Sequence, residues 1–238
     1  MEKFNKIVLN IPHASLNCQS LAESGWKENA NLINIMIKET DWHTDFIFTD
    51  TNNKSVVPFI FPYSRFIVDV ERLENDPLES EGRGIVYKNI GSFARTTDDS
   101  YKQHLLEMRK DYLDRIADEI DSETIVIDCH SFNNELAKDV DICIGYNDDW
   151  SKPDKETIDN IVSIFESAGY RVAINRPYSN SITPKDSKDY KSVMIEVNKK
   201  LYLRNGIEIN IDTRYAPRLT STIKKVYNSL LQASHTVN

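Results

Sequence analysis

Short apolar segments rich in β-branched residues alternate along the chain with longer segments of helical periodicity. The apolar segments, each predicted to form a β-strand, are 7–11, 56–61, 66–70, 124–128, 142–144, 170–174 and 193–197. Several are apolar throughout rather than alternating, which is typical of strands covered on both faces. Pro58 cannot donate a backbone hydrogen bond, so we expect its strand to lie at a sheet edge or to begin there.

Three segments have apolar residues at intervals of three and four, as amphipathic helices do. They span about 101–120, about 154–168 and a C-terminal stretch from about Pro217. Gly169 stands where the second helix needs a C-terminal cap. This alternation of strands and helices predicts an α/β protein, a three-layer α/β/α sandwich. Because no Gly-, Ser- or Pro-rich linker interrupts the chain, we expect a single domain over residues 1–238.

The composition is that of an ordinary globular protein, with 40% hydrophobic and 28% charged residues among 238. A formal net charge of −8 disfavours nucleic acid as a partner, because an acidic surface repels phosphate. Three cysteines without a CxxC pair indicate reduced thiols. The N-terminal segment 1–6 lacks the long apolar region of a signal peptide, and no apolar run reaches the roughly 18 residues of a membrane span. We therefore expect a cytoplasmic protein without membrane or nucleic-acid partners.

Two of the five histidines directly follow predicted strands. His13 follows the first strand, and His130 follows the strand that ends near Asp128. In open α/β sheets, ligands bind beyond the carboxyl ends of strands, so two such histidines could converge on one metal ion. The structural alternative is that each is a loop histidine with local hydrogen bonds.

A catalytic zinc ion commonly has three protein ligands and one open position. Asp41 is our candidate for the third ligand, and nearby His43 and Asp45 are alternatives. Asp41 could instead cap a helix that begins there.

Glu196 interrupts the apolar strand 193–197, where an unpaired acid is costly. It could face outward into solvent, or it could point into a site and act as a general base. Arginine supplies the natural clamp for a carboxylate substrate, because its planar fork matches that group. Arg65 and Arg72 flank the predicted strand 66–70, and Arg83 and Arg176 lie in loops.

At these residues the chain resembles the N-formylglutamate amidohydrolase family. The matching segments, in the family's order and covering about residues 7–205, are Pro12-His13-Ala14-Ser15, Thr40-Asp41-Trp42-His43, Tyr63-Ser64-Arg65-Phe66-Ile67-Val68-Asp69 with Arg72, Asp128-Cys129-His130-Ser131-Phe132, Arg176-Pro177-Tyr178-Ser179 and Ile195-Glu196-Val197-Asn198 before Leu201-Tyr202. The resemblance implies a mixed central sheet flanked by helices, as in zinc carboxypeptidases and related phosphorylase/hydrolase-like folds. It also implies Zn2+, or another divalent transition metal, and hydrolysis of an amide between an acyl group and an amino acid.

By position in these segments, the resemblance makes His13, Asp41 and His130 the metal ligands and Glu196 the general base. It makes Arg65, Arg72, Arg176 and Ser131 the substrate-binding residues. The chain departs from zinc carboxypeptidases, whose first ligand pair is His-x-x-Glu, because no acid follows His13 at that spacing.

The substrate implied is a small anionic N-acyl amino acid, with N-formyl-L-glutamate hydrolysed to formate and L-glutamate. The alternatives are a deacylase or exopeptidase for another carboxylate, such as a peptidoglycan fragment, and a non-catalytic binding protein of the same fold. A purely structural α/β domain would need neither metal nor converging histidines.

Overall fold

Six strands form the central sheet of the computed structural model, which describes residues 1–179, 189–204, 210–212 and 214–232. Their spatial order is β2 (Val56–Ile60), β1 (Lys6–Ile11), β5 (Thr124–Phe132), β8 (Lys191–Asn198), β6 (Ile142–Gly145) and β7 (Val172–Ile174). All neighbours are parallel except β6 and β8, so the sheet is mixed, as the resemblance implied. Strand β2, which contains Pro58, lies at an edge and confirms that prediction.

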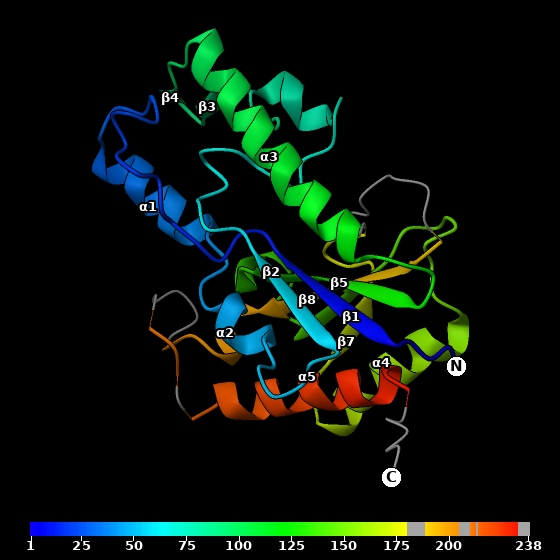
Figure 1. Ribbon diagram of the computed structural model, residues 1–238. Coiled ribbons are helices and arrows are strands. Elements are labelled where there is room, and N and C mark those ends of the chain that lie inside the picture. Colours follow the sequence, from blue (N-terminus) through cyan, green and yellow to red (C-terminus); the bar gives the residue numbers. More distant parts are fainter. Residues whose placement is uncertain (180–188, 205–209, 213, 233–238) are drawn as a thin grey trace.

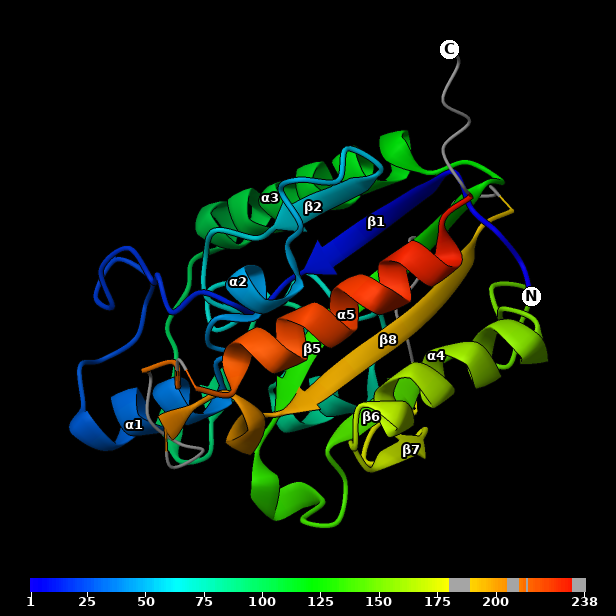
Figure 2. The same cartoon turned by 90° about the horizontal axis from the view of Figure 1, so that it is seen from below.

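Helices cover both faces of this sheet and produce the predicted three layers (Figures 1 and 2). One face carries α3 (Asp99–Glu119). The other carries α2 (Thr44–Phe48), α4 (Lys155–Ser167) and α5 (Ala216–Leu230). None of the described helices has the length and apolar character needed to cross a membrane.

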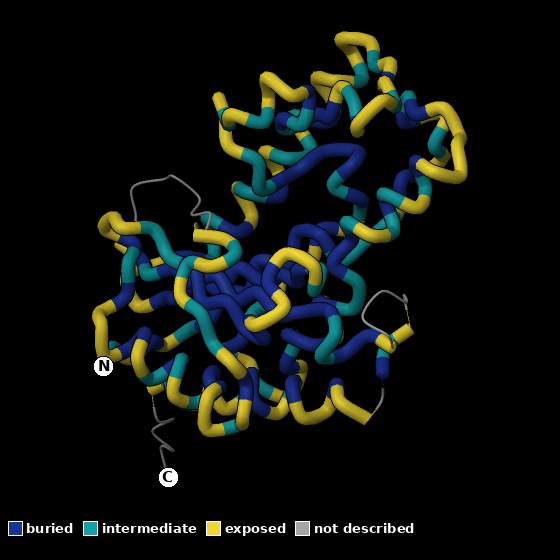
Figure 3. Tube along the Cα trace, turned by 180° about the vertical axis from the view of Figure 1, so that it is seen from behind, coloured by how far each residue is buried: buried dark blue, intermediate teal, exposed yellow. Residues whose placement is uncertain are grey.

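Alternation within the strands divides the core between the two faces. In β1, Ile7 and Leu9 pack in the cluster that includes α4 and α5, whereas Val8 packs in the cluster that includes α3. Successive strand side chains point to opposite faces, so a fully apolar strand can serve both layers. Figure 3 shows the resulting continuous buried interior along the strands.

The predicted helices begin and end close to the expected positions, and their caps explain why. The side chain of Asp154 accepts a hydrogen bond from the backbone N–H of Thr157 and so starts α4. Gly169 ends it with φ of +82°, a conformation that favours glycine. Helix α1 (Ala30–Glu39), capped by Asn29, was not anticipated.

The prediction of a strand over 66–70 was wrong. These residues form turns, and the backbone N–H of Asp69 donates to the carbonyl of Ile85. The apolar side chains Phe66, Ile67, Val68 and Val70 are nevertheless buried. A short apolar run indicates that a segment is buried, but buried segments can be either strands or covered loops.

The segment that follows forms a projection, which we call the lobe and define as residues 72–98. It contains a short 3-10 helix, η1 (Pro77–Glu81), and the antiparallel strands β3 (Asn89–Ile90) and β4 (Phe93–Ala94). Figures 1 and 3 show the lobe beyond one end of the sheet. It therefore supplies side chains that can face the strand ends from outside the sheet.

Candidate active site

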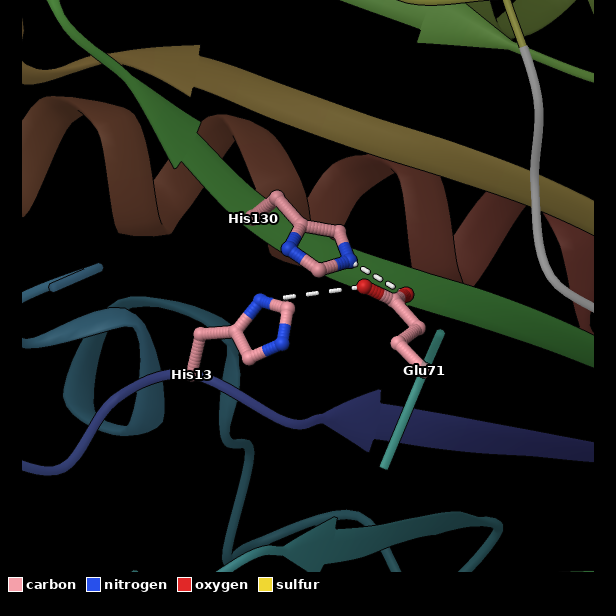
Figure 4. Close-up of side chains that lie close together, drawn as sticks. All are labelled: His13, Glu71 and His130. Carbon is pink, nitrogen blue, oxygen red and sulfur yellow. Dashed lines mark hydrogen bonds and ion pairs between the residues drawn. The ribbon is translucent and has the colours of Figure 1, made fainter. Parts of the chain in front are cut away.

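His13 and His130 meet at the carboxyl ends of neighbouring parallel strands. His13 follows β1, and His130 lies near the end of β5, where it stands in register with Glu196 of β8. The two imidazole rings have centroids 5.2 Å apart, and Figure 4 shows Glu71 beside both. The topology of the sheet thus assembles side chains that are far apart in the sequence.

The His13 imidazole has one occupied nitrogen and one open nitrogen. Its Nε2 lies 3.0 Å from Asp69 Oδ1, whereas its buried Nδ1 has no hydrogen-bond partner among the described residues. Burial, reinforced by the nearby Arg65 charge, lowers the pKa of His13. A neutral ring that donates its Nε2 proton to Asp69 presents a lone pair at Nδ1, which is the state a metal ligand needs.

The His130 imidazole lies between two carboxylates. Its Nδ1 is 3.2 Å from Asp41 Oδ2, and its Nε2 is 2.7 Å from Glu71 Oε1. Burial works to lower the pKa of His130, but Glu71 and Asp41 outweigh it and raise that pKa well above the ordinary value. One of these nitrogens can bind a metal ion while the other donates to a carboxylate.

The acidic residues around the histidines include one that sequence reasoning missed. His13, Glu71 and His130 offer ligand atoms that all lie within 4.8 Å of one another. Glu71 lies two residues beyond Asp69, and only its place in the matched segment near Arg72 could have suggested it.

Asp41 also approaches both histidines, with Oδ2 3.9 Å from His13 Nδ1. Its carboxylate is buried, and its Oδ1 accepts a hydrogen bond from Ser131 Oγ at 3.2 Å. Burial opposes ionisation of Asp41, yet His130 and Lys199 lower its pKa to about 2. His43 forms the N-terminal cap position of α2, and neither it nor Asp45 lines the cleft described below.

Glu196 points into the same site. Its side chain is buried, and its Oε2 has no hydrogen-bond partner in the described part of the chain. Burial raises the pKa of Glu196 to about 8; His130 partly offsets this effect, while Asp41 and Glu71 add to it. Glu196 is thus a carboxyl group that can exchange a proton near neutral pH.

The predicted arginines divide into two groups. Arg65 Nη2 donates to Asp69 Oδ2 at 2.9 Å, and Arg72 Nη2 donates to the same oxygen at 3.4 Å. Both arginines line the cleft. Arg176 lies outside that lining and forms a two-pronged, half-exposed ion pair with Asp139. The structure therefore does not bring Arg176 to the other site residues.

A cleft of about 570 Å³ connects these groups. One wall is formed by the strand ends with His13, His130 and Glu196, and the opposite wall comes from the lobe. The volume lies within the range of about 300–1,000 Å³ typical of small-molecule sites.

A mixed α/β sheet with histidines, an unpaired glutamate and arginines at its strand ends defines an enzyme with a candidate metal centre. The model of the N-formylglutamate amidohydrolase family matches residues 5–203. The chain therefore belongs to the N-formylglutamate amidohydrolase family and is a hydrolase of this amidohydrolase type.

Two solved structures are similar to the whole chain. N-formylglutamate amidohydrolase from Ralstonia eutropha has a TM-score of 0.66 and 16% identity, with 97% of this chain and 95% of that chain covered. A gene product of Agrobacterium tumefaciens has a TM-score of 0.63 and 17% identity, with 94% and 91% covered. At these identities the likeness establishes the fold alone. A search among curated proteins gave no significant match.

Proposed function

We propose that the protein is a zinc-dependent amidohydrolase that converts N-formyl-L-glutamate and water to formate and L-glutamate. The observation that carries the proposal is the buried, unpartnered Nδ1 of His13, held by Asp69 to face His130 and two carboxylates. Family membership supplies the reaction type.

The metal ligands in this proposal are His13, Asp41 and His130. Two ligand atoms on a tetrahedral zinc ion lie about 3.4 Å apart, given bonds of about 2.1 Å. The separation of 3.2 Å between Asp41 Oδ2 and His130 Nδ1 is close to this spacing, and the 3.9 Å between Asp41 Oδ2 and His13 Nδ1 is somewhat longer. The 2.7 Å between Glu71 Oε1 and His130 Nε2 is short for two ligands but typical of a charged hydrogen bond.

Glu71 then accepts the Nε2 proton of His130, as Asp69 accepts that of His13. Carboxylates behind ligating histidines fix the tautomer and the ring orientation. Asp41 is oriented in turn by Ser131. The donor set of two neutral imidazoles and one carboxylate suits zinc and leaves a position for water. When bound here, zinc would supply Lewis-acid polarisation of the amide carbonyl and would acidify water.

Glu196 is the general base in this proposal. Glu196 lines the cleft, its Oε2 has no partner in the described part of the chain, and its carboxylate accepts a proton from the attacking water. Glu196 then donates that proton to the leaving amine nitrogen as the carbon–nitrogen bond breaks. A carboxyl whose pKa lies near the working pH suits both transfers, because it is populated both as the carboxylate that accepts the proton and as the acid that donates it.

A deacylase or exopeptidase acting on a longer carboxylate substrate is the second candidate. The cleft volume of about 570 Å³ favours it, because N-formylglutamate is a small ligand for such a space.

Formate and amine release from N-formyl-L-glutamate by the zinc-loaded protein tests the proposal. Glu196→Gln should lower kcat about 10²- to 10⁴-fold, the range typical of general base catalysis, while zinc stays bound. Glu166→Gln, an exposed acid on α4, is the matched control and should retain activity. Near wild-type turnover by zinc-loaded Glu196→Gln would refute the role of Glu196. Release from longer N-acyl amino acids alone would favour the second candidate.

A further inference from the structure

The cationic groups that line the cleft differ in whether an acid already neutralises them. Arg65 and Arg72 share Asp69, and Arg72 also approaches Asp76 at 3.5 Å. Lys199 lies 3.8 Å from Asp41. These cations are committed to internal carboxylates, so a substrate carboxylate must compete with those partners.

Arg83 lines the same cleft without such a partner. No acidic side chain in the described ranges forms an ion pair with its half-buried guanidinium. Lys38 also lacks one there, but its ammonium is exposed on the last turn of α1. A guanidinium presents a planar fork that pairs with both oxygens of a carboxylate, whereas an ammonium is a single mobile charge.

The loop that carries Arg83 is held in place by its backbone. The Arg83 N–H donates to the carbonyl of Leu78 at 2.9 Å, and the Gly82 carbonyl accepts from Lys88 at 2.7 Å. Gly82 has φ of +77°, a conformation that favours glycine. A fixed backbone limits the positions that the guanidinium can reach, which lowers part of the entropic cost of ordering it on a ligand.

Apolar side chains also line the cleft, and two of them, Leu73 and Leu78, belong to the lobe that carries Arg83. Leu73 and Leu136 line the cleft although they are among the exposed large hydrophobic residues. Leu78 of the lobe also lines it. A fixed cation next to apolar side chains suits a carboxylate carried on a short methylene chain.

We infer that Arg83, with Leu73 and Leu78 of the lobe, forms a distal subsite that binds the side-chain carboxylate of an N-acyl acidic amino acid. The inference rests on the proposed function and assigns one of its substrate groups. The contacts of Arg65 with Asp69, and of Asp69 with His13, keep Arg65 near the reacting end. Unlike Arg65 and Arg72, Arg83 forms no ion pair with Asp69 in the described part of the chain, so we assign it to the end of the substrate farther from the scissile amide.

The test compares two ligands that differ in one group, N-formyl-L-glutamate and N-formyl-L-glutamine. Arg83→Gln should raise KM for the acid about 10- to 100-fold, as expected for loss of a charged hydrogen-bonded pair, and leave the amide unchanged. For the acid, the KM of Arg83→Lys should lie between the values of wild type and Arg83→Gln. Arg115→Gln, on α3 outside the cleft lining, is the control and should match wild type.

Binding separates failure of this inference from failure of the proposed reaction. Calorimetric titration of zinc-loaded Glu196→Gln with the same two ligands, with and without Arg83→Gln, requires no turnover. Weaker binding of the acid alone in the double variant supports the subsite even if no ligand is hydrolysed. An unchanged preference for acid over amide, or no binding of either ligand, overturns it. Hydrolysis of both ligands with that unchanged preference would leave the proposed function standing without the subsite.

Discussion

The assignment of the metal ligands depends on which carboxylate binds zinc and which only orients His130. Asp41→Asn and Glu71→Gln remove one negative charge each and keep the side-chain shape. The binding free energy of a zinc site with four ligands is about 10–16 kcal/mol, or about 3 kcal/mol per ligand. Loss of one ligand should therefore lower the zinc affinity about 10²- to 10³-fold. Loss of an orienting carboxylate costs about 10- to 100-fold. We therefore expect Asp41→Asn to weaken zinc binding more than Glu71→Gln.

The assay is competition with a chromophoric chelator, which reports zinc affinity without any need for activity. Glu135→Gln, an acid of the cleft wall outside the 4.8 Å cluster of His13, Glu71 and His130, is the control and should bind zinc as wild type does. Unfolding curves of each variant establish that a loss of zinc is not a loss of fold. If Glu71→Gln loses more affinity than Asp41→Asn, the reasoning from ligand spacing is refuted, and Glu71 is the ligand.

Two further predictions concern stability. In the metal-free protein, folded Glu196 keeps its proton up to a pKa of about 8, whereas the unfolded chain releases it near 4.5. The protonated Glu196 therefore contributes to the free energy of unfolding fully below pH 4.5, and this contribution is lost as pH rises through 8, by up to about 1.4 kcal/mol per pH unit. The free energy of unfolding of Glu196→Gln, measured with urea, should depend less on pH than that of wild type. Asp69→Asn should destabilise the protein by about 3–5 kcal/mol, because it leaves Arg65 and Arg72 without their shared buried carboxylate. An unfolding midpoint within error of wild type would contradict this.

Much of the fold could be predicted because its strands and helices carry their own signals. The apolar segment 124–128 forms part of β5, as expected for a strand covered on both faces. Pro58, which lacks a backbone N–H, lies in the edge strand β2 as predicted. The segment 66–70 shows the limit of this reasoning. Its apolar residues are buried beneath turns, and hydrophobicity alone does not reveal whether backbone hydrogen bonds go to a neighbouring strand.

The candidate site shows a second limit. The sequence indicates which residues lie close together, but not which atoms of their side chains face the site. The rule that ligands gather at strand ends predicted from sequence that His13 and His130 converge, whereas the inward direction of Glu196 was only one of two interpretations. Which nitrogen of a histidine is open depends on what binds the other, and Asp69 and Glu71 reach those nitrogens from outside the sheet. No periodicity encodes such a contact. Identifying the class of chemistry at a site therefore needs the strand order, whereas assigning each ligand atom needs the hydrogen-bond partners behind it.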